Sequence, residues 1–322
     1  MLAAYANSSD FQNPLSCLVV GDRPEPQARP GWTTVAMRAA SLNQHDLWSL
    51  RGIGLPPDRL PMILGCDAAG IDQEGNEVIA YPIVADAPVG MDETMDRSRT
   101  ILSELHQGTF AELVTVPQRN LIPKPADWSW AEAACLPTAW LTAYRMLAVR
   151  SGLKPGNTVL VQGAGGGVAT ACIMLGRAMG MRVWATSRSE AKRERALGIG
   201  AHQVFESGAR LPERVDAVME TVGAATWEHS VKVLKPGGTI VISGATTGPN
   251  PPASLTRIFF MQLSVVGSTM GTQEDMSNLV ALCSLAGIRP LVDHTVSLAQ
   301  ARDGFAAMES GDLFGKIVIT NE

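Results

Sequence analysis

Hydrophobic and polar positions change their rhythm near the middle of the chain. After residue 157, short apolar runs alternate with amphipathic stretches. The apolar runs predict strands at 158–162, 182–186, 203–205, 216–220, 239–243 and 263–267. The amphipathic stretches predict helices at 167–179, 190–197 and 225–234. Because strands that alternate with helices form right-handed βαβ units, the pattern predicts an α/β fold with a doubly wound parallel sheet.

The segments on either side follow a different pattern. A second helix of a helical pair is expected after Pro137. Before residue 122, apolar and polar positions alternate at 33–43 and predict a strand, and 76–84 and 110–117 are two more strand candidates. The polar stretch at 85–108 predicts a loop with a short helix. Beyond residue 268, the pattern predicts a helix at 274–285, a strand at 293–296, a helix at 299–309 and a final strand, GKIVIT.

A burst of glycine, QGAGGGVA, lies between the first predicted strand of the parallel sheet and its helix. The strict dinucleotide pattern G-x-G-x-x-G is absent, and the nearest register is Ala164-x-Gly166-x-x-Ala169. Glycine lets the backbone approach a pyrophosphate, and the helix start supplies N–H groups and partial positive charge. A glycine-rich connection without a ligand is the alternative, but the strand–turn–helix context favours a dinucleotide. The cofactor-binding residues expected here are Gly163, Ala164, Gly165, Gly166, Gly167 and Val168.

The end of the next predicted strand indicates which dinucleotide to expect. In NAD-binding proteins, an acidic residue about 20 positions beyond the fingerprint binds the ribose 2′-hydroxyl. Here Ser187 takes that place, with Arg188 beside it and Lys192 nearby. A hydroxyl and two cations suit a 2′-phosphate, so the sequence favours NADP(H). The alternative is that the two cations are solvated charges at a helix start, and Glu190 is a complication.

Composition narrows the class of protein. The 322 residues are 46% hydrophobic and 18% charged, which suits a globular chain with a sizeable core. A net charge of −5 disfavours a general nucleic-acid-binding face, and no apolar run reaches the ~18 residues that span a bilayer. The N-terminus lacks the pattern of a signal peptide, and five scattered cysteines fit reduced thiols. We therefore expect a cytoplasmic protein with neither nucleic acid nor membrane as a partner.

Seven motifs together resemble the medium-chain dehydrogenase/reductase superfamily, in particular its zinc-free quinone oxidoreductase and enoyl reductase branch. They are AASLNQHDLWSLRG, LPMILGCDAAG, GTFAELVTVP, LPTAWLTAYRML, VLVQGAGGGVA, LKPGGTIVISG and FGKIVI. Each motif is weak alone, but their order and spacing extend the resemblance over almost the whole chain.

The resemblance implies a Rossmann domain inserted into a mainly-β, GroES-like catalytic domain, with the active site in the cleft. The implied catalytic segments are 1–122 and 269–322, and the implied NADP-binding domain is 123–268. Such proteins are commonly dimers or tetramers, so a homodimer or homotetramer is expected. Residues 255–266 are a candidate strand for pairing across a dimer interface.

The resemblance also bears on zinc. Zinc-dependent relatives have a cysteine where this chain has Asn43, a histidine where it has Cys66, and a third ligand near 136–137, where this chain offers none. Catalytic zinc normally takes three protein ligands and keeps an open fourth position. Only Cys66 could serve, with His45, Asp46 or Asp67 as helpers, and the four-cysteine structural lobe is also absent. We therefore expect no bound metal.

The family pattern implies further site residues. Asn43 and Asp46 would line the nicotinamide side, Thr138 would lie near the carboxamide, and Lys316 would lie near the cleft. Structural alternatives remain, because Asp46 could only brace a loop and Thr138 could only cap a helix. Backbone that would hold the ribose and nicotinamide is expected at Gly244, Ala245, Val266, Gly267 and Ser268.

The reaction also needs a source for a proton, and the sequence offers two side chains for that role. Many relatives have a tyrosine where Gln44 stands in this chain. His45 is therefore the first candidate for a catalytic proton donor and Tyr81 the second, with water as the alternative.

Without a metal Lewis acid, reduction of an activated C=C bond is easier to arrange than oxidation of an alcohol. The expected function is a zinc-independent, NADPH-dependent oxidoreductase that transfers a hydride to a quinone or to the C=C bond of an α,β-unsaturated carbonyl compound. One alternative is a trans-acting enoyl reductase that acts on a carrier-bound acyl chain in a biosynthetic pathway. Another is a non-catalytic NADPH-binding protein, and stoichiometric zinc would favour a zinc alcohol dehydrogenase.

Overall fold

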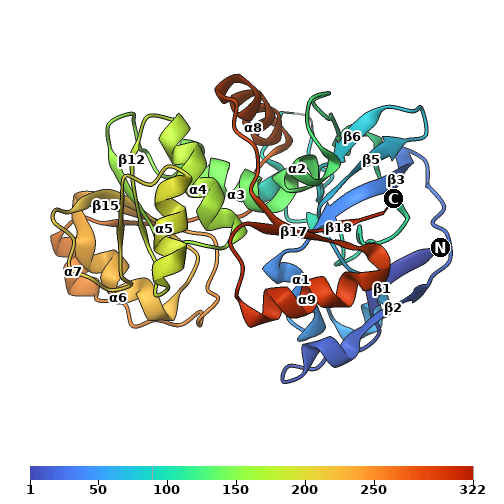
Figure 1. The fold of residues 1–322 in the computed structure, drawn as a ribbon, viewed down its shortest axis with the longest axis horizontal. Helices are drawn as coiled ribbons and strands as arrows, with labels where there is room; N and C mark the ends of the chain where they lie inside the picture. The colour runs from blue at the N-terminus through green and yellow to red at the C-terminus, as the bar shows by residue number, and fades with distance from the viewer. Residues whose placement is uncertain (89, 322) are drawn as a thin grey trace. The chain divides into compact units, whose positions relative to one another are not determined.

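Two units make up the part of the chain that the structure, a computed structural model, describes: residues 1–88 and 90–321 (Figure 1). Unit 1 contains Met1–Thr138, Thr272–Ser284 and Arg289–Glu322, and unit 2 contains Ala139–Gly271 and Leu285–Ile288. The predicted loop at 85–108 is described without residue 89, which lies outside the described residues. The domain limits expected at 122 and 268 remain a prediction.

Unit 1 is mainly β. Its largest sheet runs in the order β10-β6-β5-β3-β18-β17, with β9 also paired to β3, and β2-β1-β4 and β7-β8 form smaller sheets. The C-terminal strand β18 pairs antiparallel with β3 and parallel with β17. The strands are β1 (Leu2–Ala6), β2 (Leu18–Asp22), β3 (Trp32–Ser41), β4 (Met62–Ile63), β5 (Ala68–Asp72), β6 (Glu77–Ala80), β7 (Ile83–Val84), β8 (Thr100–Ile101), β9 (Leu113–Pro117), β10 (Leu121–Pro123), β17 (Val292–Ser297) and β18 (Lys316–Thr320).

The core of unit 1 joins distant parts of the chain. In β3 the buried side chains of Val35 and Met37 alternate with more exposed neighbours, as the sequence pattern predicts. They belong to the same apolar cluster as Phe110 and Phe305, whose rings meet edge to face at 5.9 Å. The helices are α1 (Gln44–Leu50), α2 (Trp130–Ala134), α8 (Gln273–Ala286) and α9 (Ala301–Ser310), and the 3₁₀ turns are Pro14–Cys17, Pro57–Arg59, Glu93–Met95, Gln118–Asn120 and Leu298–Gln300.

Unit 2 contains the predicted parallel sheet, in the order β13-β12-β11-β14-β15-β16. The chain moves from β11 towards β13 in one direction and from β14 towards β16 in the other. Because these crossovers are right-handed, α4 and α5 cover one face of the sheet and α6 and α7 the other. The strands are β11 (Thr158–Val161), β12 (Arg182–Thr186), β13 (Gln203–Phe205), β14 (Val215–Glu220), β15 (Leu234–Ile242) and β16 (Ser264–Gly267). The helices are α3 (Leu141–Tyr144), α4 (Gly167–Ala178), α5 (Glu190–Gly198), α6 (Ala224–Val233) and α7 (Leu255–Phe260).

Two local expectations need correction. The helix expected after Pro137 is interrupted, because α3 lies between π-helical turns at Leu136–Trp140 and Arg145–Arg150. Proline has no N–H for the regular helical bond, which favours an irregular start. The candidate strand at 255–266 is instead the helix α7 followed by β16, because its apolar residues Leu255, Ile258 and Phe259 recur at helical spacing.

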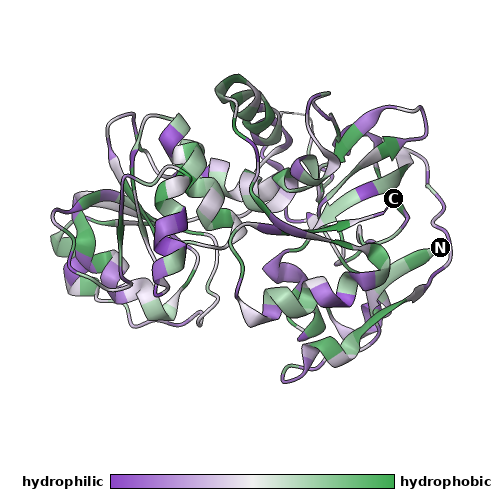
Figure 2. Cartoon of the chain, viewed as in Figure 1, coloured by the Kyte–Doolittle hydropathy of each residue, from purple (hydrophilic) through white to green (hydrophobic). Residues whose placement is uncertain are grey.

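The hydropathy of the helices in unit 2 differs from one helix to the next. Figure 2 shows hydrophilic residues along α5, whose sequence EAKRERALG is rich in charge, and hydrophobic residues in α7. Within residues 1–88 and 90–321, no helix combines the length and apolar character that crossing a bilayer requires.

Candidate active site and cofactor-binding loops

The glycine turn connects β11 to α4 at the carboxyl edge of the parallel sheet. Gly163 and Gly165 have φ angles of +75° and +134°, which glycine adopts without steric penalty. Gly166 is the N-cap of α4, and a Cβ atom added there would meet no atom within 4 Å. The first amide groups of α4 have no intrahelical acceptor, so this open turn fits the pyrophosphate of a dinucleotide. Within the turn, Ala164 donates its N–H to the carbonyl of Thr186 at 2.7 Å.

Ser187 directly follows β12, where the ribose 2′-position of a dinucleotide is expected. Its hydroxyl accepts the N–H of Ser189 at 3.2 Å, while Arg188 is exposed and the backbone N–H of Lys192 is capped by Ser189. The structure adds Arg193, which sequence reasoning missed. The Arg193 guanidinium donates to the carbonyls of Ser187 at 2.8 Å and Arg188 at 3.3 Å, so it lies beside the predicted position. The sequence SRSEAKRERA contains Arg193 but does not show towards which residues its side chain points.

The remaining expected cofactor residues of unit 2 lie at or beyond the carboxyl ends of β15 and β16. Ser268 donates its N–H to the carbonyl of Ile242 at 2.8 Å, which joins the two strand ends. The carbonyl of Gly267 accepts a bond from Arg150 at 3.0 Å. Unit 2 therefore brings its expected cofactor residues to one edge of the sheet, where parallel α/β sheets bind ligands. These residues are Gly244, Ala245, Val266, Gly267 and Ser268.

In unit 1, the carboxylate of Asp67 has no exposed surface and accepts hydrogen bonds from two expected site residues and from Ser41. The hydroxyl of Ser41 donates to Asp67 at 2.6 Å and the side-chain amide of Asn43 donates at 2.9 Å. The hydroxyl of Thr138 also donates to this carboxylate. Sequence reasoning named Asp67 only as a possible metal helper, because nothing in LGCDAAG shows that its partners come from three distant segments.

The ammonium group of Lys316 completes this buried cluster. It donates to the carbonyl of Leu42 and to Oδ1 of Asn43, both at 2.6 Å, and lies 3.6 Å from Asp67. Burial raises the pKa of Asp67, and the Lys316 charge together with the hydrogen bonds from Asn43, Ser41 and Thr138 opposes that rise. The ammonium group therefore has two hydrogen-bond acceptors inside unit 1 and the Asp67 carboxylate nearby as its counter-charge.

His45 lies between a thiol and a carboxylate. Its Nδ1 is 3.4 Å from Sγ of Cys66, and its Nε2 is 3.4 Å from Oε1 of Glu104. Burial alone would lower the pKa of His45, but Cys66, Asp46 and Glu104 outweigh burial and raise the pKa well above 6.5. Burial raises the pKa of the Cys66 thiol, which donates to the carbonyl of Leu102 at 3.3 Å. The contacts of His45 therefore favour the protonated form of its ring.

The other two catalytic candidates have different surroundings. Asp46 is buried, and its two oxygens accept the backbone N–H groups of Asn43 at 2.8 Å and Gly65 at 3.0 Å. Through these bonds Asp46 braces the loop and caps α1, which is a structural role. Tyr81 directly follows β6 and is buried, with its N–H bonded to the carbonyl of Asn120 at 2.8 Å.

One cluster of side chains near His45 contains the donor atoms that a metal ion could use. Among the described residues, the possible ligand atoms of His45, Asp46 and Cys66 lie within 4.8 Å of one another. Asp46 already bonds two backbone amides, and the Cys66 thiol is fully buried. Nearby, Lys316 supplies the positive charge beside Asp67. This leaves a thiol and an imidazole, fewer than the three ligands of a catalytic zinc site, so the residues do not fit that group.

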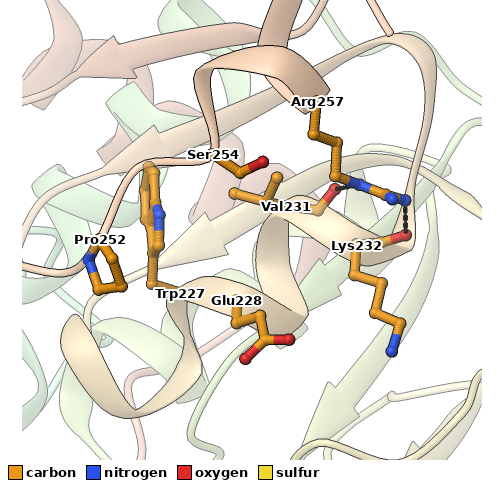
Figure 3. Close-up of a pocket in the computed structure, with 7 residues that line it drawn as sticks. All are labelled: Trp227, Glu228, Val231, Lys232, Pro252, Ser254 and Arg257. Carbon is orange, nitrogen blue, oxygen red and sulfur yellow. Dashed lines mark hydrogen bonds between the residues drawn. The ribbon is translucent and has the colours of Figure 1, made fainter. Parts of the chain in front are cut away.

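A surface pocket of about 230 Å³ lies elsewhere in unit 2, between α6 and the segment leading into α7 (Figure 3). Arg257 crosses it and donates to the carbonyls of Val231 at 3.3 Å and Lys232 at 2.9 Å, which caps the end of α6. None of the residues expected to bind the cofactor lines this pocket. The lining residues are Trp227, Glu228, Val231, Lys232, Pro252, Ser254 and Arg257.

Comparison with known proteins gives two domain matches. A family described as "Alcohol dehydrogenase GroES-like domain" matches residues 29–126, and one described as "Zinc-binding dehydrogenase" matches residues 167–284. An acryloyl-coenzyme A reductase of Metallosphaera sedula is 29% identical over 316 residues, which cover 92% of this chain and 94% of that protein. Polyketide synthase GfsB of Streptomyces halstedii is 30% identical over 304 residues, which cover 90% of this chain and 5% of that protein.

The solved structures agree. The crystal structure of an NAD-dependent alcohol dehydrogenase is 30% identical and aligns over 100% of both chains with a TM-score of 0.92. The predicted resemblance and fold class, a GroES-like domain with a Rossmann parallel sheet, are confirmed. On the domain matches, the strand order and this full-length similarity, the chain belongs to the medium-chain dehydrogenase/reductase superfamily of oxidoreductases.

Proposed function

We propose that this protein transfers a hydride from NADPH to the C=C bond of an α,β-unsaturated carbonyl compound without a catalytic metal. The observation that carries the proposal is the open glycine turn at the start of α4, at the same sheet edge as Ser187 and Arg193. This edge combines amide donors for a pyrophosphate with a hydroxyl and a guanidinium for a ribose 2′-phosphate.

The choice of NADP(H) over NAD(H) rests on charge. Ser187 occupies the position where NAD-binding proteins have a carboxylate, and the cations Arg188 and Lys192 belong to the same segment. Arg193 is already oriented towards the carbonyl of Ser187, so little side-chain ordering is needed for it to meet a phosphate. The solved relative with 30% identity is an NAD-dependent enzyme, so cofactor preference is a sharp test of this part of the proposal.

Bound NADPH would supply the hydride to the β-carbon of the substrate. Negative charge then develops on the carbonyl oxygen, and one proton must reach the α-carbon. His45 suits the role of proton donor, because its neighbours raise the pKa of the imidazole and so favour its protonated form. The carboxylate of Glu104 orients the His45 ring. Asp46 accepts the N–H of Asn43 and so fixes the backbone at the start of α1, the helix that contains His45.

An enoyl thioester is the substrate class that the comparisons favour. The M. sedula relative is an acryloyl-coenzyme A reductase and matches this chain over nearly its whole length. A quinone also accepts a hydride with negative charge developing on a carbonyl oxygen, so a quinone is the alternative acceptor. The similarity to polyketide synthase GfsB favours a second candidate, reduction of an enoyl chain on a carrier protein, although the match covers 5% of that synthase.

The residues around Asp67 support the proposed independence from zinc. A lysine ammonium group faces this buried carboxylate as its counter-charge, and Asn43 and Thr138 bond to it as neutral donors. The family description "Zinc-binding dehydrogenase" makes metal content worth measuring directly.

We propose a homodimer formed through unit 2. β16 is the last strand of its sheet as the structure describes it, and the adjacent helix α7 exposes 66% of Phe259 and 78% of Phe260. Exposed aromatic side chains beside an unpaired strand edge favour association with another copy. A cytoplasmic location and a homotetramer remain predictions.

The function is tested by NADPH and NADH oxidation with EDTA-treated protein against acryloyl-CoA, crotonyl-CoA, a carrier-bound crotonyl group and quinones. We expect turnover with NADPH, best with a thioester, and much less with NADH. Turnover that depends on added zinc would contradict the proposal. NADPH binding without turnover of any acceptor would favour the non-catalytic alternative.

The cofactor is tested separately with two arginine variants. Arg193→Ala should raise the Kd for NADPH about tenfold and leave the Kd for NADH unchanged, because one charge-assisted contact to a phosphate is worth about 1.5 kcal/mol or more. Arg182→Ala is the matched control, because Arg182 begins the same strand, β12, at the opposite edge and pairs with Glu213. Equal effects of Arg193→Ala on both cofactors would exclude a role in 2′-phosphate recognition.

A further inference from the structure

A buried chain of polar side chains runs from the glycine turn of unit 2 to Glu220, and the proposed chemistry does not use it. We propose that Glu220 is a positioning residue for the dinucleotide. It would hold the glycine turn in shape through Ser230, Gln162 and Thr186, and the neighbouring loop through backbone amides. This inference rests on the proposed cofactor binding at the glycine turn.

The first arm of the chain reaches the glycine turn. Gly163 donates its N–H to the hydroxyl of Thr186 at 3.3 Å, and that hydroxyl donates to Oε1 of Gln162 at 2.6 Å. The side-chain amide of Gln162 donates to the hydroxyl of Ser230 at 2.9 Å, and Ser230 donates to Oε2 of Glu220 at 2.6 Å. Every bond runs in the same direction, so the carboxylate is the final acceptor and polarises the whole chain.

The second arm holds the loop between β14 and α6. Oε1 of Glu220 accepts the N–H groups of Val222 at 2.8 Å and Gly223 at 3.1 Å. The hydroxyl of Thr226, in the first turn of α6, donates to both carboxylate oxygens at 2.9 Å. Gly223 has a φ of +91°, so this loop has a backbone conformation that needs support.

The two loops also meet directly. A Cβ atom added to Gly163 would lie 2.7 Å from Cγ2 of Val222, so a shift in either loop moves the other. Val222 is positioned by its N–H bond to Glu220. The carboxylate therefore controls the glycine turn by two routes, one through hydrogen bonds and one through packing.

Location favours a role in binding over a role in stability alone. Glu220 and Thr186 are the last residues of β14 and β12, and Gln162 directly follows β11, which lies between those two strands. These are neighbouring carboxyl ends, where parallel α/β sheets bind ligands. A buried charge seldom adds to the stability of a protein, because apolar residues of the same volume often stabilise the fold equally well.

Burial makes the chain sensitive to a single change. Glu220, Ser230 and Thr186 have no exposed surface and Gln162 has 1%, so water cannot replace a lost partner. A buried donor or acceptor left without a partner is destabilising. Replacing Glu220 by glutamine removes the charge and one acceptor oxygen, and it adds an NH₂ group that faces N–H and O–H donors.

The test measures the Kd for NADPH by its fluorescence, together with thermal unfolding of the same full-length variants. Glu220→Gln should raise the Kd for NADPH about tenfold or more, the factor that corresponds to one hydrogen bond to a charged group at the weak end of its range. Asp216→Asn is the matched control on the same strand. Asp216 accepts the N–H of Thr158 at 2.7 Å and the ammonium of Lys235 at 2.9 Å, at the opposite edge of the sheet. It should lower the Tm without changing the Kd.

A second pair of variants tests the hydrogen-bonded arm even if Glu220→Gln does not fold. Thr186→Val removes the hydroxyl that links Gly163 to Gln162 and should raise the Kd for NADPH, whereas Thr186→Ser keeps the hydroxyl and should restore affinity. Hydrogen exchange at the Gly163 amide should accelerate in Thr186→Val and in Glu220→Gln.

The outcomes separate this inference from the proposed function. Wild-type protein that does not bind NADPH would contradict both. Wild-type binding with unchanged affinity in Glu220→Gln and Thr186→Val would contradict the positioning role alone. A rise in Kd of the same size in Asp216→Asn would also overturn it, because the effect would then come from a general loosening of the sheet.

Discussion

Replacement of Lys316 by methionine tests the buried cluster around Asp67. Methionine keeps most of the apolar stem but removes the ammonium group. Lys316 is 3% exposed, and its nitrogen lies 2.6 Å from two oxygen acceptors and 3.6 Å from the Asp67 carboxylate. The variant therefore leaves a buried carboxylate without its cation, while Ser41, Asn43 and Thr138 still donate to it.

The expected loss of unfolding free energy is about 3 kcal/mol near pH 8. Removal of one partner from a buried ion pair costs about 3–5 kcal/mol, and the three remaining donors place this case at the lower end. Protonation of Asp67 limits the loss. Burial already raises the pKa of Asp67 and Lys316 opposes the rise, so the pKa climbs further in the variant. Each pKa unit corresponds to about 1.4 kcal/mol.

The sign of the pH dependence follows from that shift. A carboxyl group with a raised folded pKa binds more protons in the folded state than in the unfolded state between the two pKa values. Stability from this group therefore falls as pH rises from about 3.9 through the folded pKa. Because the folded pKa is higher in Lys316→Met, its stability deficit should be larger at pH 8 than at pH 5.

Urea unfolding of wild type, Lys316→Met, Asp67→Asn and the double variant at both pH values measures the interaction. The double variant should be more stable than Lys316→Met at pH 8, because it no longer buries an unpaired charge. A loss below about 1 kcal/mol for Lys316→Met, or a loss independent of pH, would refute a buried ion pair.

Other features of the chain give further expected outcomes. Gly163→Ala should lower the Tm, because Gly163 has a φ of +75° and an added Cβ meets Val222. Gly166→Ala adds a Cβ that meets no atom, so it should lower the Tm less, by the cost of alanine at an N-cap, and weaken NADPH binding. Burial lowers the pKa of His229, with Lys232 acting the same way and Ala209 and Glu220 opposing. Neutral His229 accepts a bond from Gln162, so stability should fall as pH drops below about 6.5, and His229→Gln should remove that slope. All five cysteines are free and buried, so Ellman's reagent should react with them only after unfolding. Burial also raises the pKa of Cys135 and Cys283 to about 12, which slows the reaction of these two thiols further.

Periodicity predicts the parallel sheet well because its strands are buried on both faces. The apolar run TVLV of β11 and the glycine turn after it are local signals, and each agrees with the fold. The strands β1 and β5 were not predicted. β1 pairs with β2 and β4, and β5 with β3 and β6, so their stability comes from partners distant in sequence that a local window does not contain.

The candidate site divides in the same way. The motifs identified Asn43, Thr138 and Lys316 one at a time, but their meeting at Asp67 depends on how segments more than 200 residues apart fold together. Glu220 was also beyond sequence reasoning. In VDAVMETVG it ends an apolar strand as an ordinary acidic residue would, and its role is visible only when the amides and hydroxyls that surround it are in place.

Transfer of deuterium from the nicotinamide C4 position of labelled NADPH is the most direct measurement of the central claim. Metal-free, EDTA-treated protein would be mixed with crotonyl-CoA, and the product analysed by mass spectrometry and NMR. We expect one deuterium at the β-carbon of butyryl-CoA when the correct C4 face is labelled, and a solvent-derived proton at the α-carbon. Product without deuterium at the β-carbon, or product formed only after zinc is added, would contradict metal-free hydride transfer.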